Sequence, residues 1–182
     1  MIICIQGGAE FADECREMDA YFLSLIPDLE ITIFPGASEH ERSAALTSEN
    51  AIAYFASLGR KARRITDLMD AEALVLPGGS PRHLLERLLP EQEHLATLPA
   101  IWGASAGAMV LAATTYLPDR GQSVAGLGFI PGRVQPHASS QHLAARDPGV
   151  WALAEHEGVV ASLAEMKGES ESRQLLRQFR KA

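Results

Sequence analysis

The sequence predicts an α/β fold, a three-layer α/β/α sandwich whose central sheet is mostly parallel. Short apolar segments of strand length alternate with helical patterns through residues 1–113, which is typical of parallel sheets covered by helices on both faces. The length of 182 residues, with 47% hydrophobic and 21% charged residues, predicts a single domain over residues 1–182. Glycine-containing turns follow three expected strands, at the edge where ligands bind in such sheets.

Strands and helices are expected to alternate through the first part of the chain. Apolar runs of strand length fall at residues 1–6, 29–34, 62–68, 73–76 and 99–102. Helix-forming stretches are found at residues 10–25, 41–58, 82–89 and 106–113. Beyond residue 115 turn residues become frequent, and we expect loops or a hairpin at 116–128, strands at 129–135 and 150–154, and a closing helix or frayed tail at 174–179.

The composition excludes several classes of partner. The net charge is −7, which argues against binding to nucleic acid or to an anionic membrane, because both reward clustered lysine and arginine. No apolar run is long enough to span a bilayer, and the first residues are typical of a strand and not of a signal peptide. Cys4 and Cys15 are expected to be buried free thiols, which fits a cytoplasmic protein.

Residues 103–107, Gly-Ala-Ser-Ala-Gly, match the G-x-S-x-G pattern of a nucleophile elbow, in which a serine lies on a sharp turn between a buried strand and a helix. Side chains flanking the serine would block the turn and the approach of a substrate, and glycine tolerates the backbone angles required. An apolar run precedes Ser105 and a helix-forming run follows it. This context favours a nucleophile over an incidental serine in a strand-to-helix turn.

A nucleophilic serine needs a base that takes its proton, and the chain has 6 histidines. His137 is the best placed, because it follows the strand expected at residues 129–135 and would reach the same sheet edge as Ser105. His142 comes shortly after it. The other histidines fall in expected loops or on helix surfaces, so His137 is the candidate base.

Spacing alone does not decide which carboxylate would orient the base. The candidates Asp147, Glu155 and Glu157 all follow His137, and the two glutamates flank His156 just after an apolar run. In α/β-hydrolases the acid precedes the histidine in the chain. The order found here therefore disfavours the α/β-hydrolase interpretation of the elbow.

Residues 78–80, Gly-Gly-Ser, follow an expected strand and open a helix, so their N–H groups could bind an anion. In a serine hydrolase, the N–H groups of Gly79 and Ala106 would form the two halves of an oxyanion hole. The alternative is a plain strand-to-helix turn. Neither this turn nor residues 7–11 match a dinucleotide fingerprint or a P-loop, so no nucleotide cofactor is expected. No HExxH pattern or Cys/His cluster occurs, so no metal is expected.

Four segments together resemble the dipeptidase E and cyanophycinase family of serine peptidases, whose fold is distantly related to that of class I glutamine amidotransferases. The most specific are the Ser-Ala-Gly-Ala segment and the Pro-His segment, and all four occur in the family's order over about residues 73–160. They are residues 76–80 (LPGGS), 103–108 (GASAGA), 126–137 (GLGFIPGRVQPH) and 147–158 (DPGVWALAEHEG).

This resemblance implies that Ser105 is the nucleophile and His137 the base. The acid in that family is a glutamate followed by glycine, which implies Glu157 in preference to Glu155. The implied activity is that of a serine hydrolase, a peptidase or amidase on short peptides. Apart from the resemblance, no cofactor is expected, and a homodimer is left open. The alternative is a catalytically inactive, amidotransferase-like protein that binds a ligand or regulates a partner.

Overall fold

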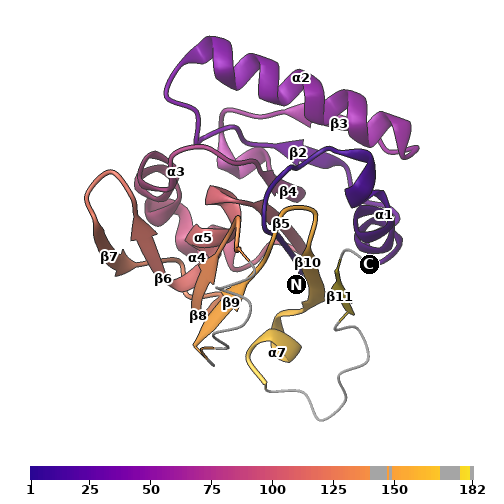
Figure 1. The fold of residues 1–182 in the computed structure, drawn as a ribbon. Helices are drawn as coiled ribbons and strands as arrows, with labels where there is room; N and C mark the ends of the chain where they lie inside the picture. The colour runs from indigo at the N-terminus through magenta and orange to yellow at the C-terminus, as the bar shows by residue number, and fades with distance from the viewer. Residues whose placement is uncertain (140–146, 148, 169–176, 181–182) are drawn as a thin grey trace.

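A computed structural model of the chain describes residues 1–139, 147, 149–168 and 177–180, which form two β-sheets and the helices around them (Figure 1). The central sheet contains β1 (Ile2–Gln6), β2 (Ile31–Ile33), β3 (Ala62–Arg64), β4 (Ala73–Leu76), β5 (Ala100–Ala104), β10 (Gly158–Ser162) and β11 (Arg177–Phe179). The described helices are α1 (Arg16–Ser24), α2 (Glu41–Ser57), α3 (Pro81–Leu88), α4 (Gln92–Leu95), α5 (Ala106–Leu111) and α7 (Leu163–Met166).

The central sheet has seven strands in the order β11-β10-β1-β5-β4-β2-β3. Strand β10 is antiparallel to both of its neighbours, and the other pairs are parallel. The predicted fold class, a mostly parallel sheet between helical layers, is therefore confirmed. The carboxyl ends of β1, β4 and β5 lie at one edge. The turns after β1 and β4 contain glycines, and β5 leads into the turn at Ser105.

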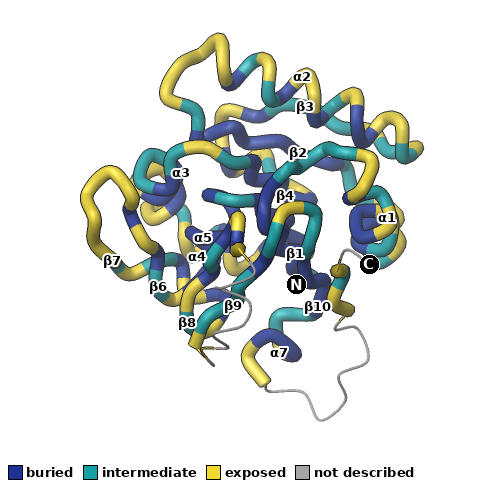
Figure 2. Tube along the Cα trace, in the orientation of Figure 1, coloured by how far each residue is buried: buried dark blue, intermediate teal, exposed yellow. Residues whose placement is uncertain are grey.

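Each face of the central sheet carries its own hydrophobic core. Figure 2 shows that β1 and β4, in the middle of this sheet, are largely buried. Side chains alternate along a strand, so Ile3 and Ile5 of β1 pack with α3 and α5, whereas Cys4 packs with α1 and α2. All three side chains are fully buried. These two cores hold the strand ends that carry the turns in fixed positions.

The smaller sheet contains β6 (Ala112–Leu117), β7 (Gln122–Ala125), β8 (Ile130–Gln135) and β9 (Val150–Ala152), in the order β7-β6-β8-β9. It packs on the core that contains α3 and α5. The hairpin allowed at residues 116–128 is present, formed by β6 and β7. Strand β8 confirms the strand expected at 129–135 but belongs to this second sheet, so His137 approaches the site from outside the central sheet.

Several predicted elements differ from the structure. The helix expected at residues 10–25 begins later, because Ala9 and Phe11 have positive φ angles of 51° and 66°, which a right-handed helix excludes. The end of the expected helix at 106–113 is the start of β6, and β10 was not expected. The closing helix at 174–179 is wrong for residues 177–179, which form β11, and residues 174–176 lie outside the described part. No described helix has both the length and the apolar character needed to cross a membrane.

Candidate active site

Ser105 lies at the junction of β5 and α5, on a turn with unusual backbone angles of φ 50° and ψ −113°. A non-glycine residue at such angles is strained, and strain of this kind occurs at functional sites where the surrounding structure enforces it. The Ser105 N–H donates to the carbonyl oxygen of Gln6 at 3.1 Å, which ties the turn to the end of β1.

The two glycines that flank Ser105 are needed for close packing. A Cβ atom added at Gly103 would lie 2.7 Å from the carbonyl carbon of Gly107, and one added at Gly107 would overlap the carbonyl oxygen of Leu76. Helix α5 therefore sits directly against the ends of β4 and β5. The G-x-S-x-G pattern has a steric cause in this chain, as predicted.

His137 follows β8 by two residues and reaches the serine. Its Nε2 atom lies 2.9 Å from Ser105 Oγ, and its backbone N–H donates to the carbonyl oxygen of Gly7 at 2.9 Å. A Cβ atom at Gly8 would lie 2.6 Å from His137 Nδ1, so only glycine leaves room for the ring. The structure thus brings Ser105 and His137 together. The other nearby histidine, His142, lies outside the described residues.

The carboxylate beside His137 belongs to Glu155, not to Glu157. Glu155 Oε1 lies 3.4 Å from His137 Nδ1, and catalytic hydrogen bonds are often this long in the absence of substrate. Glu157 instead accepts from the N–H of Ala154 at 3.1 Å and stays within its own loop. The expectation that Glu157 faces the base is therefore wrong in this structure. Asp147 accepts from the N–H of Gly149 in its own turn.

The residues that follow the two glutamates explain why the sequence pattern favoured Glu157 over Glu155. His156, directly after Glu155, has φ 64°, so the left-handed position where glycine is favoured is taken by histidine. Gly158, directly after Glu157, lies in β10, where a Cβ atom would overlap Ile5 and Met18. The Glu-Gly pair thus marks tight packing between strands. The signal that favours Glu155 is its position directly after the apolar run at 150–154.

Only one of the N–H groups in the turn at residues 78–80 is free for an oxyanion. The Gly78 N–H donates to the Glu10 carboxylate at 2.9 Å, and the Ser80 N–H donates to the carbonyl oxygen of Ala37 at 2.9 Å. In the described part of the chain, neither Gly79 N–H nor Ala106 N–H donates to another group. Ala106 directly follows Ser105, and Gly79 follows Gly78, whose added Cβ atom would lie 3.6 Å from Ser105 Oγ. The role of these two N–H groups as an oxyanion hole stays a prediction. Glu10 was not anticipated from the sequence.

A second possible nucleophile, Cys15, does not have the properties of one. Its Sγ atom lies 3.9 Å from His156 Nδ1, so a thiol–imidazole pair exists. However, burial and the nearby charge of Asp19 raise the pKa of Cys15 to about 12. The thiolate, which is the reactive form, is therefore scarce at neutral pH. Among the described residues, no group of three or more His, Cys, Asp or Glu side chains is arranged to hold a metal.

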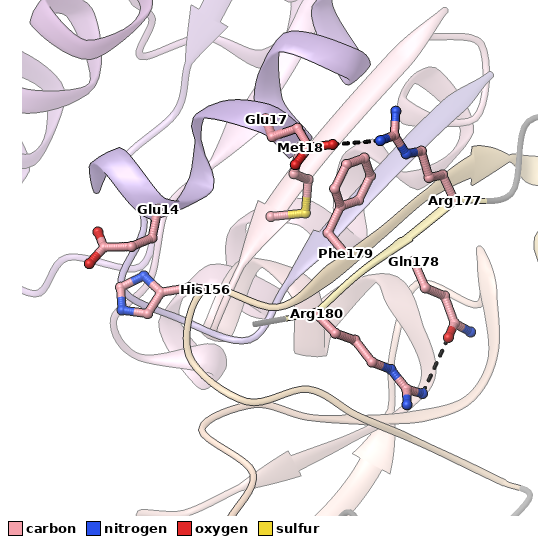
Figure 3. A pocket seen from close by; sticks show the side chains of 8 residues that line it. All are labelled: Glu14, Glu17, Met18, His156, Arg177, Gln178, Phe179 and Arg180. Atoms are coloured by element: carbon pink, nitrogen blue, oxygen red, sulfur yellow. Dashed lines mark hydrogen bonds and ion pairs between the residues drawn. The ribbon is translucent and has the colours of Figure 1, made fainter. Parts of the chain in front are cut away.

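A pocket of about 190 Å³ is lined by residues of α1 and the turn before it, by His156 and by the segment that contains β11 (Figure 3). His156 lies at its margin beside Glu14 (Figure 3), whereas neither Ser105 nor His137 lines it. Its arginines are already engaged, since Arg177 pairs with a glutamate and Arg180 donates to a glutamine. The pocket is therefore separate from the serine and is lined by Glu14, Glu17, Met18, His156, Arg177, Gln178, Phe179 and Arg180.

A buried carboxylate supports the strands beneath the site. Asp19 is fully buried and accepts hydrogen bonds from Gln6 Nε2 at 2.8 Å, Trp102 Nε1 at 2.7 Å and the Tyr54 hydroxyl at 2.6 Å. Burial raises the pKa of Asp19 to about 6, although the three hydrogen bonds lower it. Because Gln6 and Trp102 belong to β1 and β5, this cluster fixes the relative position of the two strands that lead into the site.

Comparison with known proteins supports the fold class. No family model matches the chain, and no curated protein matches it in sequence. Among solved structures, a peptidase from an acI-B1 Actinobacterium has a TM-score of 0.69 at 20% identity, covering 87% of this chain and 82% of its own. A candidate peptidase E protein from Listeria monocytogenes EGD-e has a TM-score of 0.69 at 14% identity, covering 100% of this chain and 98% of its own. The resemblance to the dipeptidase E family is thus confirmed at the level of the fold.

Proposed function

We propose that this protein is a serine peptidase that cleaves short peptides with a triad of Ser105, His137 and Glu155. The observation that carries the proposal is the 2.9 Å contact between Ser105 Oγ and His137 Nε2 on a strained strand-to-helix turn. The contact from His137 Nδ1 to Glu155 extends this chain of side chains to an acid. Two solved structures with the same fold are described as peptidases, which supports this class of reaction.

The chemistry follows from the order of these groups. His137 accepts the hydroxyl proton at Nε2 as Ser105 Oγ attacks the scissile carbonyl, and Glu155 stabilises the imidazolium through Nδ1–H. The N–H groups of Gly79 and Ala106 stabilise the developing oxyanion. His137 then returns the proton to the leaving amine, and water hydrolyses the acyl-enzyme by the same steps. No group in this scheme requires a metal or a cofactor.

A cytoplasmic location belongs to the same proposal. Cys4 and Cys15 are both buried and unpaired, and buried free thiols are typical of proteins kept in a reducing compartment.

The proposal is tested by incubating purified protein with a panel of dipeptides, isoaspartyl dipeptides and short peptides of differing charge, with products separated by mass. We expect release of amino acids or shorter peptides by the wild type and none by Ser105→Ala. The matched control is Ser123→Ala, which removes an exposed hydroxyl from β7. Equal turnover by Ser105→Ala and the wild type would exclude the triad, and no turnover by either would favour the inactive binding protein.

A further inference from the structure

The turn after β1 holds a glutamate at the edge of the proposed active site. Glu10 lies between Ala9 and Phe11, which have positive φ angles of 51° and 66°, so the backbone on both sides is in the left-handed region that side chains disfavour. Phe11 stacks on Trp102 with ring centroids 5.5 Å apart and planes 13° apart. The aromatic contact anchors the strained turn in the core and leaves Glu10 directed toward the neighbouring turn.

The Glu10 carboxylate lies beside the nucleophile. Its Oε1 atom accepts from the Gly78 N–H at 2.9 Å. A Cβ atom added at Gly78 would lie 2.9 Å from this oxygen and 3.6 Å from Ser105 Oγ. The carboxylate and the serine hydroxyl are therefore on the same side of Gly78. A substrate carbonyl attacked by Ser105 must lie close to both.

The charge of Glu10 has no counter-ion in the described part of the chain. Its one hydrogen bond there is the one from Gly78, and no lysine or arginine pairs with it. An ionised carboxylate can accept about four hydrogen bonds, so acceptor positions remain on this partly exposed side chain. An unpaired negative charge next to a developing oxyanion opposes the reaction. A substrate that brings a positive charge removes that penalty.

We propose that Glu10 is a specificity-determining residue that binds a cationic group of the substrate next to the scissile carbonyl. The group is an ammonium or guanidinium, supplied either by a free peptide N-terminus or by a lysine or arginine side chain. Peptides with an acidic residue at this position are disfavoured, because like charges at close range repel. This proposal rests on the proposed peptidase function and names the substrate class of that same site.

The test uses phosphonate diphenyl esters, which phosphonylate an activated serine with loss of phenol. The probes are the analogues of lysine, norleucine and aspartate, and each is made with its α-amine either free or acetylated. Norleucine removes the side-chain cation, and acetylation removes the N-terminal cation. The measured quantity is the second-order rate of labelling at Ser105, followed by intact mass. It is determined for the wild type, Glu10→Gln and Glu14→Gln, where Glu14 is exposed and also near the start of α1.

We expect the wild type to prefer a cationic probe over its neutral counterpart by about 10- to 100-fold, the range that hydrogen bonds to charged groups typically provide. Glu10→Gln should lose this preference while retaining labelling by the neutral probe, because glutamine keeps an acceptor oxygen for the Gly78 N–H. Glu14→Gln should keep the preference. Added salt should weaken it in the wild type, which tests the charge without any substitution.

The outcomes separate the two proposals. Labelling of Ser105 by neutral probes without a cationic preference, or a preference for aspartate, would overturn the role of Glu10 and leave the peptidase proposal standing. A cationic preference that persists in Glu10→Gln, or that salt does not weaken, would overturn it as well. Failure of every probe to label Ser105 would contradict the peptidase proposal, and the role of Glu10 would fall with it.

Discussion

Ser105 and Glu155 belong to the proposed active site, but the segments that carry them differ in burial and in the contacts that hold them in place. The nucleophile half, residues 103–107 with the ends of β1 and β4, is almost entirely buried and is held by backbone packed against backbone. The acid half, residues 137 and 153–157, is more open. The side chains of His137 and Glu155 are 50% and 59% exposed.

The two halves meet at Gly7 and Gly8, in the turn after β1. His137 and His156 each donate a backbone N–H to this turn, and the Gly7 N–H donates to the carbonyl oxygen of Glu157. These backbone hydrogen bonds position the acid half, whereas packing of glycines against strands positions the nucleophile half. The serine turn is thus held mainly by close packing of its glycines within the turn and against β4, and the acid mainly by backbone hydrogen bonds to the turn after β1.

The largest loss of activity is expected from removing either side chain of the contact between Ser105 and His137. Ser105→Ala and His137→Ala should each lower kcat by about 10⁴- to 10⁶-fold, because triad members act as one unit. Thermal unfolding of both variants should stay close to that of the wild type, since both side chains are partly exposed. A mild effect of His137→Ala in the peptide assay would mean that another group serves as the base.

Next to the nucleophile half, the substitution Gly79→Ala is expected to have the next largest effect on kcat. Its φ is 138°, and an added Cβ atom would lie 2.6 Å from the carbonyl oxygen of Ala37. Gly79→Ala should therefore displace the N–H, and loss of one oxyanion donor costs about 10²- to 10³-fold in kcat. Gly59→Ala is the matched control, because Gly59 also has a positive φ, of 77°, but has open space around its Cβ position. Equal kcat for both variants would argue against the oxyanion role.

Within the acid half, substitutions of Glu155 and Glu157 are expected to differ clearly in their effect on activity. The amide substitution of a buried orienting aspartate costs about 10⁴ in kcat in serine proteases, and we expect about 10² for Glu155→Gln because this side chain is exposed. Glu157→Gln should retain activity close to the wild type, because among the described residues its carboxylate accepts a hydrogen bond from the N–H of Ala154 in its own loop and does not contact His137. Reversed severities in the peptide assay would restore Glu157 as the acid.

The same contrast explains which parts of the site could be predicted from the sequence. Ser105 and its glycines form one contiguous pattern with a steric cause, so the turn could be recognised. The Glu-Gly pattern led to the wrong glutamate. Gly158 is a glycine because a side chain in β10 would overlap Ile5 and Met18, and the left-handed position after Glu155 is taken by His156. Glu10 could not be foreseen, because its position depends on two strained residues in a turn.

At the level of the fold, the alternation of strands and helices predicted the central sheet because each element there is a local apolar pattern. The second sheet was not predicted. Strands β6 and β8 pair in parallel, with β7 on the other side of β6. This pairing depends on packing against α3 and α5, and the local sequence does not encode such packing. Strand β10 was missed for the same reason, since its neighbour β1 lies at the opposite end of the chain.

Asp19→Asn, beneath the nucleophile half, is expected to have the smallest effect on activity but a clear effect on stability. Asparagine can still accept from Gln6 and Trp102, and the Tyr54 hydroxyl can turn to accept from its amide. The folded-state pKa of Asp19, about 6, lies above its usual value of 3.8. The stability from this group is therefore fully present below about pH 4 and is lost as pH rises through 6.

This pH dependence is measured by urea unfolding between pH 4 and pH 7. The wild type should lose about 3 kcal/mol relative to Asp19→Asn over this range, which is the energy equivalent of a shift of about two pKa units. The peptidase rate of the variant at neutral pH should be close to that of the wild type. Parallel stability curves for the two proteins would show that Asp19 does not titrate as its burial implies.

Activation of Ser105 by His137 is tested most directly by the site at which a neutral fluorophosphonate reacts. This site is determined by mass spectrometry of tryptic peptides after labelling of the folded protein. We predict one phosphonyl group on Ser105, formed at a similar rate in Glu157→Gln, more slowly in Glu155→Gln and far more slowly in His137→Ala. Labelling of another residue, or no labelling of the wild type, would contradict the claim that His137 activates Ser105.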